Sequence, residues 1–486
     1  MEQLTMQTNP VPQVNFRYAA LADEIQDKIL SGQYRAGEKL PSLRKLHNRL
    51  GLSISTIHQA YIELEKRGRV EARQKSGFFV RPLEKSPLPL PVKPATSEPP
   101  SRVRINDLAE TIVSDLQRPD IIRFGAAVAD QELMPLKQLS RIAKSMSVDE
   151  ICSGLALYDD CAGAKELRYA LAKMMMGYAG SVAVDEIITT NGCLEAVSLC
   201  LRAVAGPGDV ILMESPVFHC FLQLIEDLGM YVIELPGCPE KGMSPDAFES
   251  MISDNRVKAC LLNPNFHNPL GSVMPTPIKK AVLKIANHHG IPIIEDDIYG
   301  DIFFGTRRPS TFKGLDTTGN VLYCSSFSKT IAPGLRAGWT LPGKFYKRVM
   351  RLKLNSQLAS PNTGHIVAAR FIESGAYERH LRRLRNQIKN QVSAMSIAVA
   401  AHFPKDTRIT FPLGGMFLWI ELNKTIDAMD VFHKARQKGI SFMPGIICST
   451  TDRYKHCMRL SCGLSWSDKL EKSIAQLGRI VCALNK

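Results

Sequence analysis

Hydrophobic positions at helical spacing predict two short helices near the start of the chain. The first helix carries three leucines three or four residues apart, Leu43, Leu46 and Leu50. Gly51 follows them as a left-handed cap, and Ser53 is the expected N-cap of a second helix that ends at Gly68. One face of this second helix is apolar, with Ile57, Ala60, Tyr61 and Leu64. Two helices joined by so short a turn form a helix-turn-helix pattern.

The segment after these helices predicts a two-stranded wing. VEARQKSGFFV, residues 70–80, alternates around a polar turn at 74–77 and places Arg73 and Lys75 on the wing. The first turns of the second helix carry short polar side chains that can meet phosphates and base edges in a major groove: Ser55, Thr56, His58 and Gln59. A structural helical hairpin is the commoner explanation for a single pair of helices.

Short apolar runs in the rest of the chain predict an α/β open sheet. The runs cover residues 209–213, 259–262, 291–294 and 321–324, and helical stretches separate them. Such runs are typical of parallel strands buried on both faces. Polar segments follow each run: ESPVFHC, NPNFHNPLG, EDDIYGD and SSFSKTIAPGLRAG. Because ligands bind at the carboxyl ends of such strands, we expect these segments to line one crevice. Neither a dinucleotide fingerprint nor a P-loop is present in the sequence.

A proline-rich stretch divides the chain. Residues 81–100 contain seven prolines and no apolar periodicity, which is typical of a linker. An extended segment of this kind reaches roughly 60 Å at about 3.1 Å per residue. With 486 residues, the chain is long enough for two to four domains at about 150 residues each. We expect a DNA-binding domain at 1–80, a linker at 81–105 and a larger domain at 106–486.

Composition favours a soluble protein with an acidic partner. Hydrophobic residues make up 45% of the chain and the net charge is +14, which favours nucleic acid. Residues 1–80 hold 12 basic and 8 acidic side chains, a net of +4, so much of the excess lies in basic helices near 344–353 and 379–389. Those helices are either solvated faces or an auxiliary DNA surface. The twelve cysteines form no CxxC pair, so we expect neither disulfides nor a metal site, and a cytoplasmic location. No apolar run approaches the roughly 18 residues that span a membrane.

Lys329 lies in a segment whose residue types predict a cofactor. It is flanked by Ser326 and Ser328 and followed seven residues later by Arg336, and these hydroxyls and the guanidinium could bind a phosphate. A lysine beside a phosphate site suggests a Schiff base with pyridoxal phosphate, in which Asp296 would keep the ring nitrogen protonated. Taken singly, Lys329 is more simply a solvated loop lysine and Asp296 a helix cap. The two together, in this order, are specific.

Residues 36–80, AGEKLPSLRKLHNRLGLSISTIHQAYIELEKRGRVEARQKSGFFV, resemble the winged helix of the GntR transcription regulators over their whole length. The resemblance implies that the helices and the wing contact double-stranded DNA, and the candidate contacts are Arg44, Ser55, Thr56, His58, Arg73 and Lys75. This family often has arginine where this chain has Ile54, so one phosphate or guanine contact is lost.

Residues from about 120 to the C-terminus resemble a fold-type I pyridoxal-phosphate aminotransferase. The motifs are SSFSKTIAPGLRAGW, EDDIYGD, HNPLG, ESPVFHC, TTNGCLEAV, LALYDDCAGAKELR and HCMRLSCG. The resemblance implies a mainly parallel sheet with a small C-terminal α+β subdomain. It makes Lys329 the Schiff-base lysine, and Lys329, Asp296 and Tyr299 the catalytic residues.

The same resemblance implies roles for the other residues of the motifs. Phosphate ligands would be Ser326, Ser328, Arg336 and the loop of Gly192, Cys193 and Leu194. Asn268 and Tyr299 would bind the phenolate oxygen, and Phe218 would stack on the ring. Arg459, with Asn268, would bind a substrate carboxylate, a bidentate task that suits arginine. Tyr158 would reach the phosphate of a neighbouring subunit, which implies a homodimer.

Three positions depart from the aminotransferase pattern. Cys193 replaces Ser or Thr, Phe218 replaces Tyr, and Leu270 replaces Thr, so each position loses a hydroxyl. The first two losses are expected to weaken or retune cofactor binding.

A GntR-like head joined to an aminotransferase-like body is the layout of the MocR regulators. The sequence therefore predicts a transcription regulator that binds promoter DNA and uses pyridoxal phosphate, alone or with an amino acid or amine, as its signal. The alternative is a working aminotransferase of amino acids and 2-oxo acids. The linker is long enough to place each head over its own body or over that of its partner.

Overall fold

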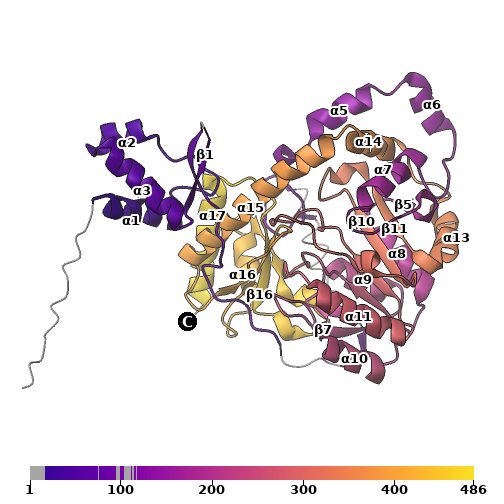
Figure 1. The fold of residues 1–486 in the computed structure, drawn as a ribbon. Helices are drawn as coiled ribbons and strands as arrows, with labels where there is room; N and C mark the ends of the chain where they lie inside the picture. Colours follow the sequence, from indigo (N-terminus) through magenta and orange to yellow (C-terminus); the bar gives the residue numbers. More distant parts are fainter. Residues whose placement is uncertain are drawn as a thin grey trace, which may run out of the picture. The chain divides into compact units, whose positions relative to one another are not determined.

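A computed structural model describes residues 17–74, 76–94, 99–102, 111, 114, 115 and 118–485. These residues form two compact units, one ending at Glu84 and the other beginning at Lys85. We call the first unit the head and the second the body; their elements are labelled in Figure 1.

The head is a three-helix unit with a β-hairpin. Its elements are α1 (Arg17–Leu30), α2 (Leu43–Leu50), α3 (Ile54–Lys66), β1 (Val70–Arg73) and β2 (Gly77–Val80). The two predicted helices and the predicted wing are present, with Gly51 at φ 65° after α2 and Ser53 as the N-cap of α3. Helix α1 was not predicted, although it contributes Leu21, Ala22, Ile25 and Ile29 to the buried core.

The body is built on an eight-stranded sheet with the order β3-β7-β6-β8-β9-β10-β11-β5. The strands are β3 (Ser101–Arg102), β5 (Ile188–Thr190), β6 (Val210–Ser215), β7 (Tyr231–Pro236), β8 (Val257–Leu262), β9 (Ile293–Asp296), β10 (Val321–Ser326) and β11 (Gly338–Leu341). Strands β7, β6, β8, β9 and β10 run parallel, whereas β3 and β11 pair antiparallel with their neighbours. The four predicted runs are the neighbouring strands β6, β8, β9 and β10, and the sheet is mainly parallel as predicted.

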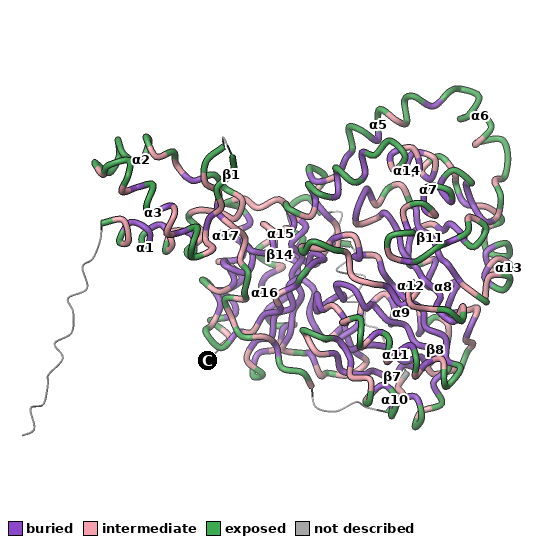
Figure 2. Tube along the Cα trace, in the orientation of Figure 1, coloured by how far each residue is buried: buried purple, intermediate pink, exposed green. Residues whose placement is uncertain are grey.

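Alternate residues of these strands pack on opposite faces of the sheet. Ile211 and Met213 contact the layer formed by α8 (Cys193–Val204) and α9 (His219–Asp227), whereas Leu212 faces α10 (Pro245–Asp254) and α11 (Thr276–His288). Figure 2 shows the strands buried between these layers. Burial on both faces explains why the strands are apolar runs without alternation.

Further helices surround the sheet and complete the body. They are α5 (Leu136–Lys144), α6 (Val148–Ala156), α7 (Lys165–Met175), α12 (Phe312–Leu315), α13 (Tyr346–Gln357) and α14 (Thr363–Glu373). The predicted basic stretches lie in α13 and in α15 (Ala376–His402). In the described part of the chain, no helix is both long and apolar enough to cross a bilayer.

The C-terminal part of the body is a smaller α+β subdomain, as predicted. Its antiparallel sheet has the order β12-β13-β16-β15. The strands are β12 (Arg408–Ile409), β13 (Phe417–Glu421), β15 (Met443–Pro444) and β16 (Cys457–Ser461). Helix α15 packs with α17 (Asp468–Leu484), which also contacts α16 (Ala428–Arg436). A short parallel pair, β4 (Ile122–Arg123) with β14 (Ile440–Ser441), joins residues before α5 to this subdomain.

Candidate functional site

The carboxyl ends of the central strands bring the predicted polar residues of the body together. Asp296 is the last residue of β9, and Lys329 follows β10 in the next parallel strand position. The ammonium of Lys329 donates a hydrogen bond to the carbonyl of Ala127 at 2.6 Å. Burial, reinforced by the positive charge of Arg459, lowers the pKa of Lys329 to about 8. The lysine is therefore close to the neutral form that acts as a nucleophile.

Asp296 is a buried carboxylate held by donors from two elements. Its Oδ1 accepts hydrogen bonds from the thiol of Cys193 at 3.3 Å and from the backbone of Ile298 at 3.2 Å. Its own carbonyl accepts from the side-chain amide of Asn263 at 2.6 Å. Burial raises the pKa of Asp296 to about 7, against the effect of the thiol bond. A cationic partner would therefore be stabilised strongly here.

Arg459 is fully buried on β16 and joins the subdomain to the site. Its guanidinium donates to Asn268 Oδ1 at 2.7 Å and to the carbonyl of Gly125 at 2.6 Å, and it lies 4.4 Å over the ring of Phe417. Both acceptors are neutral oxygens. Its Nε is buried and has no hydrogen-bond partner among the described residues. A ligand carboxylate would supply the counter-charge.

A glycine turn precedes α8 at the edge of the same region. Gly192 has φ +97°, and a Cβ there would collide with the guanidinium of Arg336. Arg336 is exposed and donates to the carbonyl of Asn191, beside this turn. The first amides of α8 belong to Cys193 and Leu194, and a helix N-terminus of this kind attracts phosphate.

The remaining predicted residues of the body divide into two groups. Ser326 and Tyr299 are buried, with the ring of Tyr299 packed edge-on against Phe417 at 5.2 Å, and Phe218 is the N-cap of α9. Ser328 donates its amide to Ser326 Oγ at 3.3 Å. Tyr158 differs because it is 82% exposed on the segment after α6, and its predicted role involves a second subunit.

Several residues of this region carry no signal that the sequence made visible. The carbonyls of Gly125 and Ala127 bind Arg459 and Lys329, and any residue type could supply them. His219 is buried next to Phe218, and burial lowers the pKa of its imidazole to about 3, so the ring is neutral. Cys193 was expected to replace a phosphate-binding hydroxyl, yet its thiol is bonded to Asp296.

The predicted DNA-binding residues lie on the head. Arg44, Ser55, His58 and Arg73 are exposed, and Thr56 is partly exposed. The hydroxyls of Ser55 and Thr56 each lie 2.8 Å from Ser53 Oγ, so both are near the N-cap of α3. Arg73 pairs with Glu71 at 2.7 Å. Lys75 lies outside the described residues.

Metal ligation has no candidate among the described residues, where no cluster of three His, Cys, Asp or Glu side chains could hold an ion. All twelve cysteines are free thiols.

Two family models match this chain. Residues 17–80 match the model "Bacterial regulatory proteins, gntR family", and residues 120–475 match "Aminotransferase class I and II". The HTH-type transcriptional regulator YjiR of Escherichia coli is 36% identical over 96% of this chain and 98% of its own length. The chain belongs to the MocR type of GntR regulators. A second HTH-type regulator of E. coli, YdcR, is 33% identical over 96% of this chain and 99% of its own.

Solved structures agree with the aminotransferase fold of this MocR body. The α-aminoadipate aminotransferase LysN of Thermus thermophilus, solved with N-(5'-phosphopyridoxyl)-L-leucine, is 25% identical with a TM-score of 0.72. The match covers 79% of this chain and 96% of that one. The class I and II aminotransferase fold implies binding of pyridoxal phosphate.

The residues of the MocR body fit that cofactor. A lysine with a lowered pKa, a buried carboxylate with a raised pKa and an uncompensated buried guanidinium are grouped at the strand ends. The open turn at Gly192 leaves room for a phosphate, since Gly338 and Arg336 fill the space a side chain would need.

Proposed function

We propose that this chain is a transcription regulator that binds promoter DNA through its head and pyridoxal phosphate through its body. One observation carries the proposal: a helix-turn-helix with an exposed recognition helix and a buried set of Lys329, Asp296 and Arg459 belong to the same chain. A regulator needs a DNA-reading surface, and a signal site is what the buried set provides.

Each residue of the buried set has one task in this proposal. The amine of Lys329 joins the aldehyde, and the carboxylate of Asp296 holds the proton of the ring nitrogen. Asn268 and Tyr299 face the phenolate oxygen, while the α8 amides, Ser326, Ser328 and Arg336 hold the phosphate. When bound, pyridoxal phosphate supplies an electron sink for an attached amine. Arg459 selects amines that carry a carboxylate.

The same residues leave a second candidate function, amino transfer between amino acids and 2-oxo acids. Lys329, Asp296 and Arg459 are all retained, and the body resembles catalytic aminotransferases such as LysN in fold. Steady production of keto acid from an amino acid and a 2-oxo acid would favour the enzyme. Promoter binding that depends on the ligand, without turnover, would favour the regulator.

A homodimer is part of the proposal, and α6 supports it. This helix contributes no buried residue, and large apolar side chains around it are exposed: Val148 (75%), Leu155 (79%), Leu157 (71%) and Tyr158 (82%). Figure 2 draws the segment as exposed along most of its length. Contiguous apolar exposure of this kind marks an interface. Light scattering of the purified chain should give twice the mass of 53.9 kDa.

Covalent attachment of the cofactor tests the ligand half of the proposal. Wild-type protein with pyridoxal phosphate should show a visible absorbance band, and borohydride should fix the label on the peptide that contains Lys329. The Lys329→Ala variant should lose both signals, and Lys313→Ala, which alters another lysine on the body, should keep them. An equally intense fixed label in Lys329→Ala would refute the assignment.

A further inference from the structure

A segment of the predicted linker is bonded to the C-terminal subdomain. Residues 89–94, which we call the strap, begin with the carbonyl of Pro89, which accepts from the amide of Ile409 on β12 at 2.9 Å. The amide of Val92 donates to Glu421 Oε2 on β13 at 2.7 Å. Between them, the carbonyl of Leu90 accepts from Arg408 at 3.2 Å. The strap is thus attached to two neighbouring strands of the small sheet.

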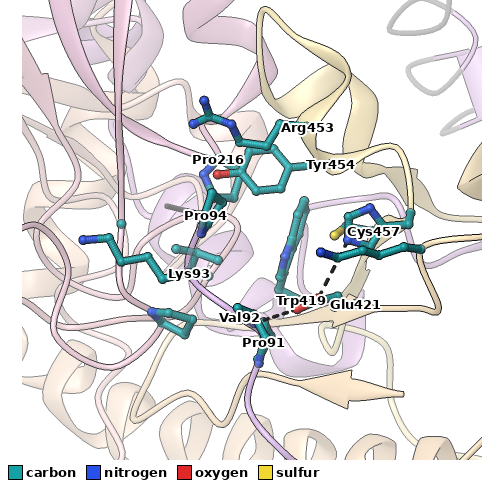
Figure 3. Close-up of a pocket in the computed structure, with 15 residues that line it drawn as sticks. Pro91, Val92, Lys93, Pro94, Pro216, Trp419, Glu421, Arg453, Tyr454 and Cys457 are labelled. Atoms are coloured by element: carbon teal, nitrogen blue, oxygen red, sulfur yellow. Dashed lines mark hydrogen bonds and ion pairs between the residues drawn. The ribbon is translucent and has the colours of Figure 1, made fainter. Parts of the chain in front are cut away.

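A cavity of about 300 Å³ lies under the strap. Figure 3 shows Trp419 and Tyr454 on one side of it and the strap residues Lys93 and Pro94 on the other. The two aromatic rings pack edge to face with centroids 5.7 Å apart, and Pro216 adds a further apolar wall. This lining offers flat apolar surfaces of the size of one ring.

The charges around the cavity are mostly positive. Lys93, Lys424 and Arg453 line it, and the one carboxylate of the lining is Glu421. Glu421 is already engaged, since it accepts from Val92 and lies 3.8 Å from the imidazole of His456. The remaining charge therefore favours an anion.

We propose that this cavity is a second ligand site, which binds a small organic anion composed of one aromatic ring and a carboxylate. The volume is at the lower end of the range for small-molecule pockets, about 300 to 1,000 Å³, and suits a single ring. The ring lies against Trp419 and Tyr454, and the carboxylate is held by the lysine and arginine side chains. A carboxylate without a ring leaves the apolar walls bare, and an aromatic amine has the wrong charge.

The cavity is distinct from the cofactor site but borders it. Lys329, Asp296, Tyr299 and Arg459 do not line it. However, Trp419 is directly opposite Arg459 in the β13–β16 ladder, and Leu270, two residues after Asn268, is part of the lining.

A ligand here touches the strap and the subdomain at once. Because Lys93 and Pro94 complete the cavity only while the strap is docked, the ligand favours the docked strap. The strap leads through residues 85–88 to the head, so its docking is a means by which a second signal reaches the head. That consequence rests on the proposed function, whereas binding to the cavity does not.

Calorimetric titration of the full-length chain with phenylacetate tests the site. The Arg459→Ala variant is used as the background, so that the carboxylate site beside the cofactor cannot answer. Phenylacetate should bind saturably, and acetate and benzylamine should bind at least about tenfold more weakly, the scale of one lost charge-assisted contact. The double substitution Lys424→Gln with Arg453→Gln should weaken phenylacetate by about tenfold or more on the same grounds. Lys438→Gln, at an exposed lysine outside the cavity, should not change it.

Hydrogen exchange of the same samples gives a second readout that does not depend on the charge variants. Phenylacetate should slow exchange in peptides covering residues 86–94, which include the Val92 amide bonded to Glu421. Absence of saturable binding, or binding that Lys424→Gln with Arg453→Gln leaves unchanged, would overturn the proposal. Loss of binding in Arg459→Ala alone would also overturn it, because the ligand would then occupy the cofactor site. None of these outcomes requires bound pyridoxal phosphate, so failure of the proposed function would appear separately.

Discussion

Lys329 carries a proton whose loss should govern attachment of the cofactor. Burial and Arg459 lower its pKa from 10.5 to about 8, so at pH 8 roughly half of the amine is neutral, against about 0.3% for an unperturbed lysine. Because only the neutral amine is nucleophilic, the rate of attachment should rise with pH and level off above about pH 8 to 9. Stopped-flow absorbance after mixing with pyridoxal phosphate measures this profile. A rate that climbs steadily through pH 10 would contradict the lowered pKa.

Cys193 should act on the cofactor through Asp296. The Cys193→Ala variant removes a hydrogen bond to a buried carboxylate, a loss of about 1 kcal/mol or about fivefold in affinity for pyridoxal phosphate. Cys193→Ser keeps a donor at the same place and should bind at least as well as the wild type. Equilibrium dialysis measures both variants. Equal affinity of the alanine and serine variants would show that this bond contributes nothing.

At the residue scale, motif residues were visible in the sequence and their backbone partners were not. Lys329, Asp296 and Arg459 could be singled out because their chemistry depends on the side chain, and the structure brings all three to the strand ends. The carbonyls of Gly125 and Ala127 could not, because a backbone acceptor has no residue type. The roles inferred from the aminotransferase resemblance remain predictions.

Among the elements, α3 should lose stability and DNA affinity when its N-cap is removed. Ser53 Oγ accepts from the amide of Thr56 at 3.1 Å and lies near the hydroxyl of Ser55. The Ser53→Ala variant should destabilise the head by about 1 kcal/mol, the typical contribution of such a cap. Asparagine is an equally good cap, so Ser53→Asn should restore the stability. Thermal unfolding and DNA anisotropy measure the two effects, and an unchanged melting curve for Ser53→Ala would contradict the expectation.

Elements with a strong periodic or apolar signal were predictable, and short or edge elements were not. The strands β6, β8, β9 and β10 are central, buried on both faces and visible as apolar runs. Strands β5 and β11 have only three and four residues, so the sequence gives little pattern to detect. The hydrogen bonds of the strap to β12 and β13 depend on main-chain atoms of a proline-rich segment, which composition alone describes as a linker.

At the scale of the whole molecule, the account requires that head and body influence each other. Coupling arises only if a ligand binds one arrangement of the chain more tightly than another, and the effect is then reciprocal. Salt dependence of DNA binding does not test this, because released counterions make affinity fall with salt under either proposed function.

The most direct test is fluorescence anisotropy of promoter DNA with the full-length chain, with and without pyridoxal phosphate and candidate amino acids. The wild type should change its DNA affinity by about 5- to 150-fold when the ligand binds, equivalent to about 1 to 3 kcal/mol of coupling. The Lys329→Ala variant should show one affinity under every condition. If the wild type and Lys329→Ala bind the DNA equally with every ligand, the cofactor is not the signal, and the body is better explained as an aminotransferase.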